Sequence, residues 1–241
     1  MLDKLINITI NIVKILKKFI TKSRVFINFR NSLRSYKLAK NNNGQMTPDS
    51  VPGQLLGEFL TKYKIKNVLE IGTWNGLGST MTIFQALDKN NVNFNLISIE
   101  SDKIFHKKAK KNFRVYKDKI DLRLGRIIEI EELPRVESID FKKHGLLQEN
   151  SEWLIQDIRR YKKINNIYKD LPDKFDFILF DGGEFSTFTE FKKLYKKTKY
   201  FGLDDIHTFK QYEVLGYIKK NNHKFTHIST AAGLSIYKHN I

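Results

Sequence analysis

Short apolar segments alternate with helical patterns along most of this chain, and this alternation constrains the fold more than any other feature. Strands are predicted at 67–71, 94–99, 120–124, 175–180 and 200–203. Helices are predicted at 51–62, 103–116, 187–198 and 207–220, and a further helix follows the turn after the first strand and ends at 87. Strands separated by helices pair in parallel, and the helices cover both faces of the sheet. We therefore expect an α/β fold with a doubly wound, mostly parallel sheet.

The C-terminal segment departs from this alternation. Residues 224–229 and 234–238 have strand character, and only Thr230-Ala231-Ala232-Gly233 joins them. Four residues are too few for a helical crossover, so these two strands must pair antiparallel. The prediction is a seven-stranded sheet with a C-terminal antiparallel hairpin.

The composition is typical of one folded domain in a reducing compartment. The chain has 241 residues, 41% of them hydrophobic, which is within the size that a single core reaches. It has no cysteine, which excludes disulfide scaffolds, thiol nucleophiles and cysteine-ligated metal sites. The lack of cysteine fits a reducing cytoplasm, which is the expected location.

Basic residues are concentrated at the N-terminus. Residues 1–40 hold ten Lys and Arg against the single acid Asp3, a net charge of +9, while the whole chain carries +17. We expect a basic N-terminal helical arm at 1–45 on a domain at 46–241. Its most apolar stretch, Leu5–Val13, is too short to span a membrane.

Several roles of the arm stay open. The apolar residues fit a helical stripe as well as a strand period. The arm would pack on the domain, mediate a homo-oligomer, or lie at a membrane surface through residues 1–40. A genome biased toward lysine would also produce the basic excess.

A long segment without strand pattern separates the third and fourth predicted strands. It covers residues 126–172, and its part at 149–168 has a helical pattern rich in Lys and Arg. Compact domains rarely contain structureless loops of this length. We expect an inserted helical cap or lid.

The first predicted strand ends in a glycine-rich turn, Glu70-Ile71-Gly72-Thr73-Trp74-Asn75-Gly76-Leu77-Gly78-Ser79-Thr80. In an open α/β sheet, such a turn lies at the carboxyl edge, where ligands bind. Glycines let the backbone approach a ligand closely, and the N–H groups of the next helix face an anion. The spacing G-x-x-x-G-x-G differs from the G-x-G-x-x-G of nicotinamide-binding folds.

This turn resembles motif I of the class I S-adenosylmethionine-dependent methyltransferases, E-x-G-x-x-x-G-x-G, which have a Rossmann-like sheet and a terminal antiparallel pair. The family also has an acid at the end of the second strand, here Glu100, next to Ser101. The resemblance covers residues 50–241. It implies that Glu100 accepts hydrogen bonds from the cofactor's ribose. The implied contacts of S-adenosylmethionine (SAM) are Glu70, Gly72, Thr73, Trp74, Asn75, Gly76, Gly78, Ser79, Glu100, Ser101 and Asp181.

The chain departs from the family after the third strand. Many members have an acid there that contacts the adenine amino group, whereas this chain has Leu124-Gly125-Arg126-Ile127-Ile128. We expect backbone groups near Arg126 and Ile127 to contact the adenine instead.

Aspartates follow the fourth and fifth strands. Asp181 ends the fourth strand, and Asp204 and Asp205 end the fifth. Both strand ends lie at the carboxyl edge, and converging carboxylates repel one another unless a proton or a cation lies between them. Oxygen ligands of this kind suit Mg²⁺ or another divalent cation.

This second pattern resembles the metal-dependent O-methyltransferases of the catechol and macrocin types. The resemblance implies that Asp181, Asp204 and Asp205 hold a divalent ion that binds and acidifies the acceptor hydroxyl. Glu184 and His207 are further candidate bases, although the comparison enzymes have Lys or His at the position of Glu184. Alternatively, Asp181 acts alone, Asp204 and Asp205 cap the next helix, and His207 packs at the N-terminus of that helix.

The function favoured by the sequence is SAM-dependent and metal-dependent O-methylation of a small polar acceptor, such as a sugar or nucleotide-sugar. An RNA methyltransferase is an alternative, because a charge of +17 suits phosphate binding. The chain lacks an N-P-P-Y-like tetrapeptide after the fourth strand and a recognisable RNA-binding module, so nucleic acid is disfavoured. A non-catalytic cofactor-binding scaffold with a basic tether is the other alternative.

Overall fold

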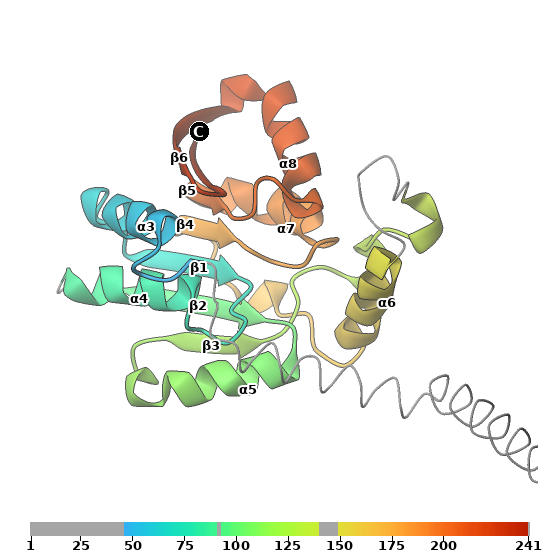
Figure 1. The fold of residues 1–241 in the computed structure, drawn as a ribbon, viewed down its shortest axis with the longest axis horizontal. Coiled ribbons are helices and arrows are strands. Elements are labelled where there is room, and N and C mark those ends of the chain that lie inside the picture. The colour runs from blue at the N-terminus through green and yellow to red at the C-terminus, as the bar shows by residue number, and fades with distance from the viewer. Residues whose placement is uncertain (1–45, 91–92, 140–148, 241) are drawn as a thin grey trace, which may run out of the picture. The chain divides into compact units, whose positions relative to one another are not determined.

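The computed structural model describes residues 46–90, 93–139 and 149–240, so the predicted arm at 1–45 lies outside the described residues. The strands are β1 (Asn67–Ile71), β2 (Asn95–Glu100), β3 (Asp121–Leu124), β4 (Phe175–Phe180), β5 (Thr198–Leu203), β6 (Phe225–Ala231) and β7 (Leu234–His239). The α-helices are α3 (Val51–Lys62), α4 (Ser79–Lys89), α5 (Lys103–Asn112), α6 (Glu149–Tyr161), α7 (Thr187–Leu194) and α8 (Phe209–Lys220). Figure 1 shows how these elements are arranged. None of these helices is long and apolar enough to span a lipid bilayer.

The seven strands form one sheet in the order β3-β2-β1-β4-β5-β7-β6. The pairs β1–β2, β1–β4, β2–β3 and β4–β5 are parallel, whereas β7 pairs antiparallel with both β5 and β6. The order reverses direction between β1 and β4, which is where open α/β sheets bind ligands. The predicted sheet and its C-terminal hairpin are confirmed.

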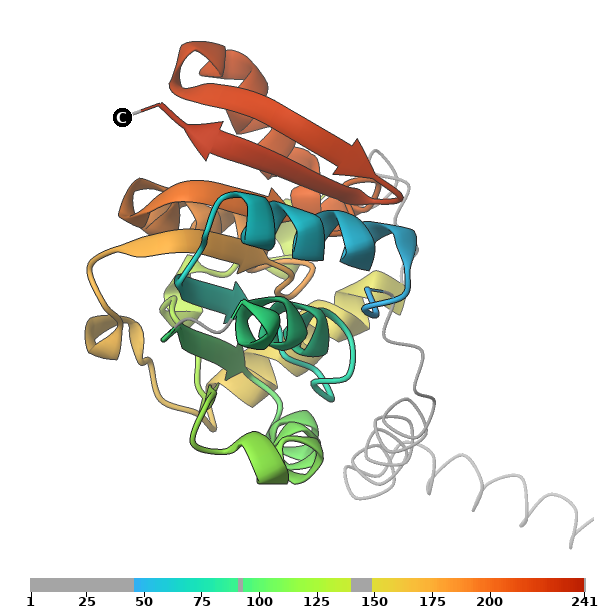
Figure 2. The ribbon, with the colours of Figure 1, turned by 90° about the vertical axis from the view of Figure 1, so that its left-hand side faces the viewer.

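Helices cover both faces of the sheet. On one face, Leu56 and Leu60 of α3 and Ile83 of α4 pack with Val68 and Phe177 of the strands. Figure 2 shows α3 and α4 in front of the strands and α6 behind them. The other face packs against α6, α7 and α8, and its core includes Leu154, Phe191, Val214, Ile178 and Phe201. Because both faces are buried, the central strands are apolar throughout rather than alternating.

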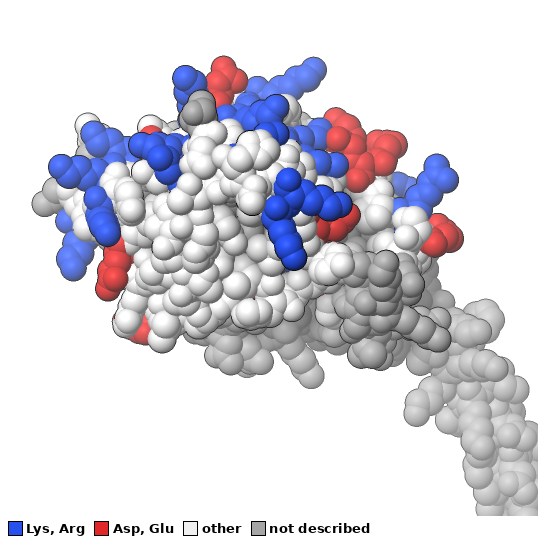
Figure 3. Space-filling view, turned by 90° about the horizontal axis from the view of Figure 1, so that it is seen from above, with Lys and Arg blue, Asp and Glu red and all other residues white. Residues whose placement is uncertain are grey.

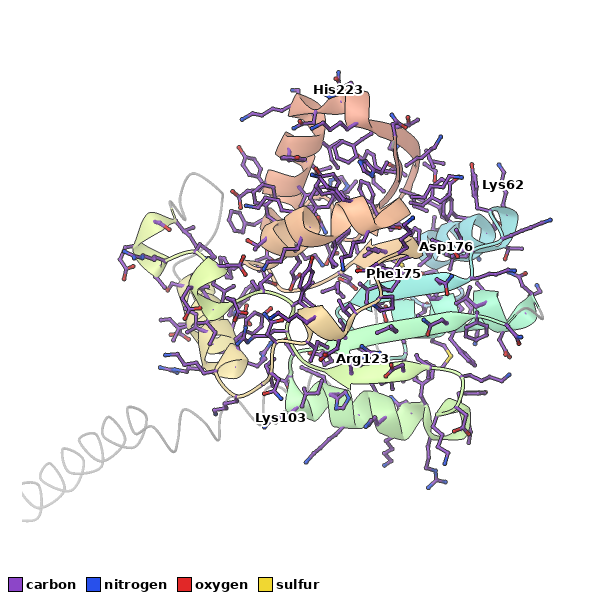
Figure 4. All side chains as sticks on the ribbon, turned by 180° about the vertical axis from the view of Figure 1, so that it is seen from behind. Lys62, Lys103, Arg123, Phe175, Asp176 and His223 are labelled. Atoms are coloured by element: carbon purple, nitrogen blue, oxygen red, sulfur yellow. The ribbon has the colours of Figure 1, made fainter. Side chains whose placement is uncertain are left out.

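A side chain ties the beginning of β1 to β4. Asp176 Oδ2 accepts hydrogen bonds from the backbone N–H groups of Lys66 (3.0 Å) and Asn67 (2.8 Å). Figure 4 shows Asp176 beside Phe175 at the start of β4. This contact sets the register in which the opposite, carboxyl ends of β1 and β4 lie side by side.

Some predicted boundaries were wrong for local reasons. The helix predicted at 149–168 ends at Tyr161, because Arg126 N and Ile167 N form backbone hydrogen bonds that pair Arg126 with residues 165–167. Strand β5 begins at Thr198, two residues earlier than predicted, since Thr198 pairs with Phe175. The hairpin turn is only Ala232-Gly233, both at positive φ, which is the geometry of a two-residue hairpin loop.

The turn after β1 approaches the end of β4 so closely that residue 72 must be glycine. Gly72 has φ +100°, and a β-carbon built there would lie 1.9 Å from the Asp181 carbonyl oxygen. The Asp181 N–H also donates to the Ile71 carbonyl at 2.9 Å. A side chain at this position would push β1 and β4 apart at their carboxyl ends.

We expect Gly72→Ala to lower the free energy of unfolding by about 3 kcal/mol, because it adds both a steric clash and an unfavourable φ. Urea unfolding followed by circular dichroism measures the change. Gly216→Ala is the matched control, because a β-carbon at Gly216 meets nothing within 4 Å and the residue lies within α8. The control should raise stability by about 1 kcal/mol. Equal stability of the two variants would contradict the close approach of β1 and β4.

Candidate functional site

The turn between β1 and α4 is held by its own backbone. Gly72 N donates to the Ile99 carbonyl at 2.9 Å, and Gly76 N donates to the Thr73 carbonyl at 3.0 Å. Trp74 and Gly76 have positive φ values of 50° and 80°. Helix α4 begins after Gly78 without a side-chain cap. Its first N–H groups therefore stay open to a polar ligand at the carboxyl edge.

Glu100, at the end of β2, faces the same turn. Its Oε2 accepts a hydrogen bond from Trp74 N at 2.6 Å, and its Oε1 accepts one from Asp102 N at 2.7 Å. The side chain is buried, and burial raises the pKa of Glu100 to about 7. A carboxylate has about four lone-pair positions. Glu100 therefore retains acceptor capacity for two further donors, such as a pair of hydroxyl groups.

A second buried carboxyl group, Glu70, lies behind the turn. Ser98 Oγ and Thr80 Oγ1 donate to Glu70 Oε2 at 2.5 and 2.6 Å. Burial raises the pKa of Glu70 to about 7. Glu70 Oε1 and Asn75 Nδ2 are buried without a hydrogen-bond partner in the described part of the chain. Unpaired buried polar atoms are rare, and here they accompany a turn shaped to receive a ligand.

The three predicted aspartates do come together. Each of Asp181, Asp204 and Asp205 offers a carboxylate oxygen, and these oxygens all lie within 4.8 Å of one another. Asp204 N donates to the Phe180 carbonyl at 3.2 Å, which aligns the ends of β4 and β5. Asp205 has φ 56°, a conformation that turns the chain sharply after β5.

A lysine that sequence reasoning missed lies among these carboxylates. Lys210 Nζ is 2.7 Å from Asp181 Oδ1 and 3.0 Å from Asp205 Oδ2. Only 6% of the Lys210 side chain is exposed. Lys210 is in the first turn of α8, where a cation is disfavoured by the helix dipole. A lysine at that position, five residues after Asp205, was the signal that could have identified it.

The protonation states of this group follow from burial and from Lys210. Burial, followed by the neighbouring Asp181 carboxylate, raises the pKa of Asp204 to about 8. Burial also raises the pKa of Asp181, although Lys210 opposes that shift. Burial lowers the pKa of Lys210, but the carboxylates of Asp181 and Asp205 outweigh burial and raise it above its ordinary value. Burial therefore favours the protonated form of Asp181 and Asp204, while the carboxylates favour the charged ammonium of Lys210.

The two other candidate bases lie in different surroundings. Glu184 Oε1 accepts a hydrogen bond from the backbone N–H of Lys210 at 3.2 Å, so its carboxylate binds the N-terminus of α8. Burial raises the pKa of Glu184. His207 is exposed and makes neither a hydrogen bond nor an ion pair within the described residues.

Helix α6, from the predicted cap segment, lies near both parts of the carboxyl edge. Arg160 of α6 forms ion pairs with Asp102 (3.4 Å), two residues after Glu100, and with Asp157 (3.3 Å) on its own helix. A β-carbon at Gly183 would lie 3.5 Å from Asp157 Oδ2. Figure 1 shows α6 on the side toward which the arrowheads of β1 and β4 point. The helix thus connects the Glu100 end of the edge with the Asp181 end.

Of the residues expected to contact adenine, Arg126 has its backbone paired within the chain. Arg126 N donates to the Asn165 carbonyl at 3.0 Å, and the Arg126 carbonyl accepts from Ile167 N at 2.8 Å. Ile127 is buried in the core. β-like pairing with residues 165–167 thus satisfies the Arg126 backbone, and a contact of nearby backbone groups such as those of Ile127 with adenine stays a prediction.

Glu190 of α7 is a buried carboxyl group that the sequence did not single out. Its Oε1 accepts a long hydrogen bond from the Tyr161 hydroxyl (3.4 Å), and its Oε2 is buried without a partner in the described residues. A β-carbon at Gly182 would lie 2.5 Å from Oε2, so Glu190 lies directly beneath the loop that follows Asp181. Burial raises the pKa of Glu190 from 4.5 to about 7.

Comparison with protein-family models found no match, and comparison with curated protein sequences found none either. Solved structures do resemble the chain. One is a provisionally assigned caffeoyl-CoA O-methyltransferase from Staphylococcus aureus, with 16% identity, full coverage of both chains and a TM-score of 0.56. Another is a methyltransferase from Podospora anserina bound to S-adenosylhomocysteine (SAH), with 11% identity, 96% coverage of each chain and a TM-score of 0.54.

A third similar structure is an O-methyltransferase from Bacillus cereus in complex with SAH. It has 13% identity and a TM-score of 0.52, and the match covers 85% of this chain and 89% of that one. The chain thus has the Rossmann-like fold of these methyltransferases.

We expect Glu190→Gln to change how stability depends on pH. The unfolded carboxyl group ionises near pH 4.5 and the folded one near 7, so stability is highest below pH 4.5 and falls as the pH rises through 7. Glutamine removes this titration, so the variant should gain up to about 3 kcal/mol over the wild type between pH 5 and pH 8. Urea unfolding at both pH values measures the difference. The exposed Glu213→Gln is the control, and an identical pH dependence of E190Q and wild type would contradict the buried state of Glu190.

Proposed function

We propose that this chain is a SAM-dependent methyltransferase that methylates a hydroxyl group of a small polar acceptor. The observation that carries the proposal is the close approach of Gly72 to the Asp181 carbonyl. It puts the glycine turn of β1 directly beside the acidic group at the ends of β4 and β5. A methyl donor bound at the turn and an acceptor bound at the acidic group would therefore be neighbours.

The residues at the turn fit the proposed cofactor. Glu100 retains acceptor capacity for both ribose hydroxyls, and the open N–H groups of α4 suit the carboxylate of the methionine part. Glu70, with one unpaired buried oxygen, adds negative charge behind the turn, where the cofactor's ammonium would bind. We assign Thr73, Ser79 and Ser101 as residues that border the proposed SAM site.

The proposed chemistry needs little from the protein besides alignment and proton removal. SAM supplies a sulfonium methyl group, which leaves by in-line displacement. As the C–O bond to the acceptor forms, the C–S bond breaks and the hydroxyl proton passes to a carboxylate. We assign this proton transfer to Asp181, because Glu184 binds the N-terminus of α8 and His207 is exposed.

A sugar or nucleotide-sugar is the proposed acceptor class. Its support is the number of polar groups at the acidic end of the site: Glu184 belongs to the loop that follows Asp181, and Asp157 and Asp205 lie close to that loop. Carboxylates accept hydrogen bonds from the several hydroxyl groups of a sugar.

A divalent cation is a second candidate component of the site. Three carboxylate oxygens within 4.8 Å of one another favour it, and they would bind the ion through Asp181, Asp204 and Asp205. The opposing observation is Lys210, whose ammonium already pairs with two of these residues. The donor set fits a metal ion only if Lys210 leaves, so no step of the proposed reaction depends on one.

An RNA acceptor is supported only by the net charge of +17. On the face drawn in Figure 3, basic and acidic side chains are interspersed around an area without charged groups. RNA-binding surfaces usually present basic residues clustered on one face. That face therefore gives no support for an RNA acceptor beyond the net charge.

We expect Glu100→Gln to weaken SAH binding about tenfold to a hundredfold, because a charged acceptor of hydroxyl hydrogen bonds is lost. Isothermal titration calorimetry with SAH measures this change. The exposed Glu131→Gln is the control, and its affinity should equal that of the wild type. An E100Q variant that folds and binds SAH as tightly as the control would contradict the assigned ribose contact. Failure of the wild type to bind SAH would contradict the methyltransferase function and favour the non-catalytic scaffold.

We expect Asp181→Asn to lose methyl transfer by at least about a hundredfold while SAH affinity stays within about threefold of the wild type. SAH formation in the presence of a panel of sugars, nucleotide-sugars, catechols and RNA measures turnover. The exposed Asp118→Asn is the matched control. Unchanged turnover of D181N would exclude Asp181 as the proton acceptor, and methylated RNA as the only product would replace the small acceptor.

A further inference from the structure

An ammonium group occupies the place where the three aspartates would bind a metal ion. Lys210 Nζ is in contact with Asp181 Oδ1 at 2.7 Å and Asp205 Oδ2 at 3.0 Å, and the lysine side chain is almost fully buried. These carboxylates come from the ends of two neighbouring strands, whereas the lysine comes from α8. The ion pairs therefore join three elements at the centre of the candidate site.

The first turn of α8 is anchored at Lys210 itself and at the residue that follows it. The backbone N–H of Lys210 donates to Glu184 Oε1. The side chain of the next residue, Gln211, is fully buried and donates to the carbonyl groups of Phe180 (3.0 Å) and Asp204 (2.9 Å). These contacts bind α8 to the carboxyl ends of β4 and β5. The anchored backbone of α8 thus fixes the point from which the Lys210 side chain extends to the aspartates.

A divalent ion and this ammonium cannot share the site. Mg²⁺ requires carboxylate oxygens at about 2.0–2.1 Å in near-octahedral geometry. An ion on Asp181 and Asp205 would lie next to Lys210 Nζ, and like charges at such a separation repel strongly in a buried site. Binding of a metal would require the Lys210 ammonium to leave its carboxylates.

We infer that Lys210 is the resident cation of this site and takes the place of a divalent metal. It neutralises the converging carboxylates and holds Asp181 in one orientation, and is thus a positioning residue rather than a catalytic one. Its effect on methyl transfer rests on the proposed function, whereas its effect on cation binding does not. The site therefore works without Mg²⁺, contrary to the expectation from sequence.

The test compares Lys210→Met, Lys210→Arg and Lys219→Met with the wild type, each as the full chain freed of metal with a chelator. Lys219 is exposed on the same helix and is the matched control. Binding of Mg²⁺ and Mn²⁺ is followed by calorimetry and by the shift in melting temperature. Methyl transfer is measured with the acceptor panel, with and without Mg²⁺.

Wild type, K210R and K219M should bind no stoichiometric Mg²⁺ at millimolar concentration, and their turnover should resist the chelator. K210M should melt at a lower temperature than the wild type without metal and should bind Mg²⁺ or Mn²⁺ at least about tenfold more tightly. Added Mg²⁺ should restore its melting temperature and part of its kcat, a rescue that a merely structural lysine would not show.

Stoichiometric Mg²⁺ binding by the wild type, or chelator-sensitive turnover, would overturn the inference, even if K210M failed to fold. A folded K210M that gains no affinity for either ion would also overturn it. SAH titration of the wild type separates the two proposals: absent SAH binding would reject the methyltransferase function, whereas the cation titrations would still decide the role of Lys210.

Discussion

The candidate site depends on one steric constraint, the contact between the turn after β1 and the end of β4. Residue 72 has no side chain, so the Asp181 carbonyl can occupy the space that a β-carbon would fill. Parallel pairing of β1 with β4 places this contact where the strand order reverses, and the turn is thereby fixed beside the acidic group. Any reaction between a ligand on the turn and one at the aspartates requires that adjacency.

The same edge concentrates buried negative charge that is only partly compensated. Burial raises the pKa of Glu70, Glu100 and Glu190 to about 7, and none of the three forms an ion pair within the described residues. Lys210 is the cation that pairs with Asp181 and Asp205. Uncompensated buried carboxyl groups reduce stability near neutral pH, and perturbed groups of this kind cluster at functional sites. The distribution of charge thus supports the location of the site independently of the glycine turn.

Helix α8 links this electrostatic arrangement to the fold. Glu184 and Gln211 bind its first turn to the strand ends, and Lys210 fills the space between the aspartates. A carboxylate that the sequence suggested as a base therefore stabilises a helix terminus. The lysine within that helix supplies the positive charge that the sequence suggested would come from a metal.

The sequence by itself determined the sheet, the hairpin and the glycine turn, because each follows from local patterns: apolar strand segments, a connection too short for a helix, and glycine spacing. It also placed Asp181, Asp204 and Asp205 at one edge, since the ends of parallel strands share that edge. Only the tertiary structure decided that Lys210 lies between them and that residues 165–167 engage Arg126. These contacts join segments far apart in the chain, or depend on how a helix is oriented on the sheet. A residue pattern can place a lysine near these acids, but it does not decide such contacts, because packing determines which buried charge meets which partner.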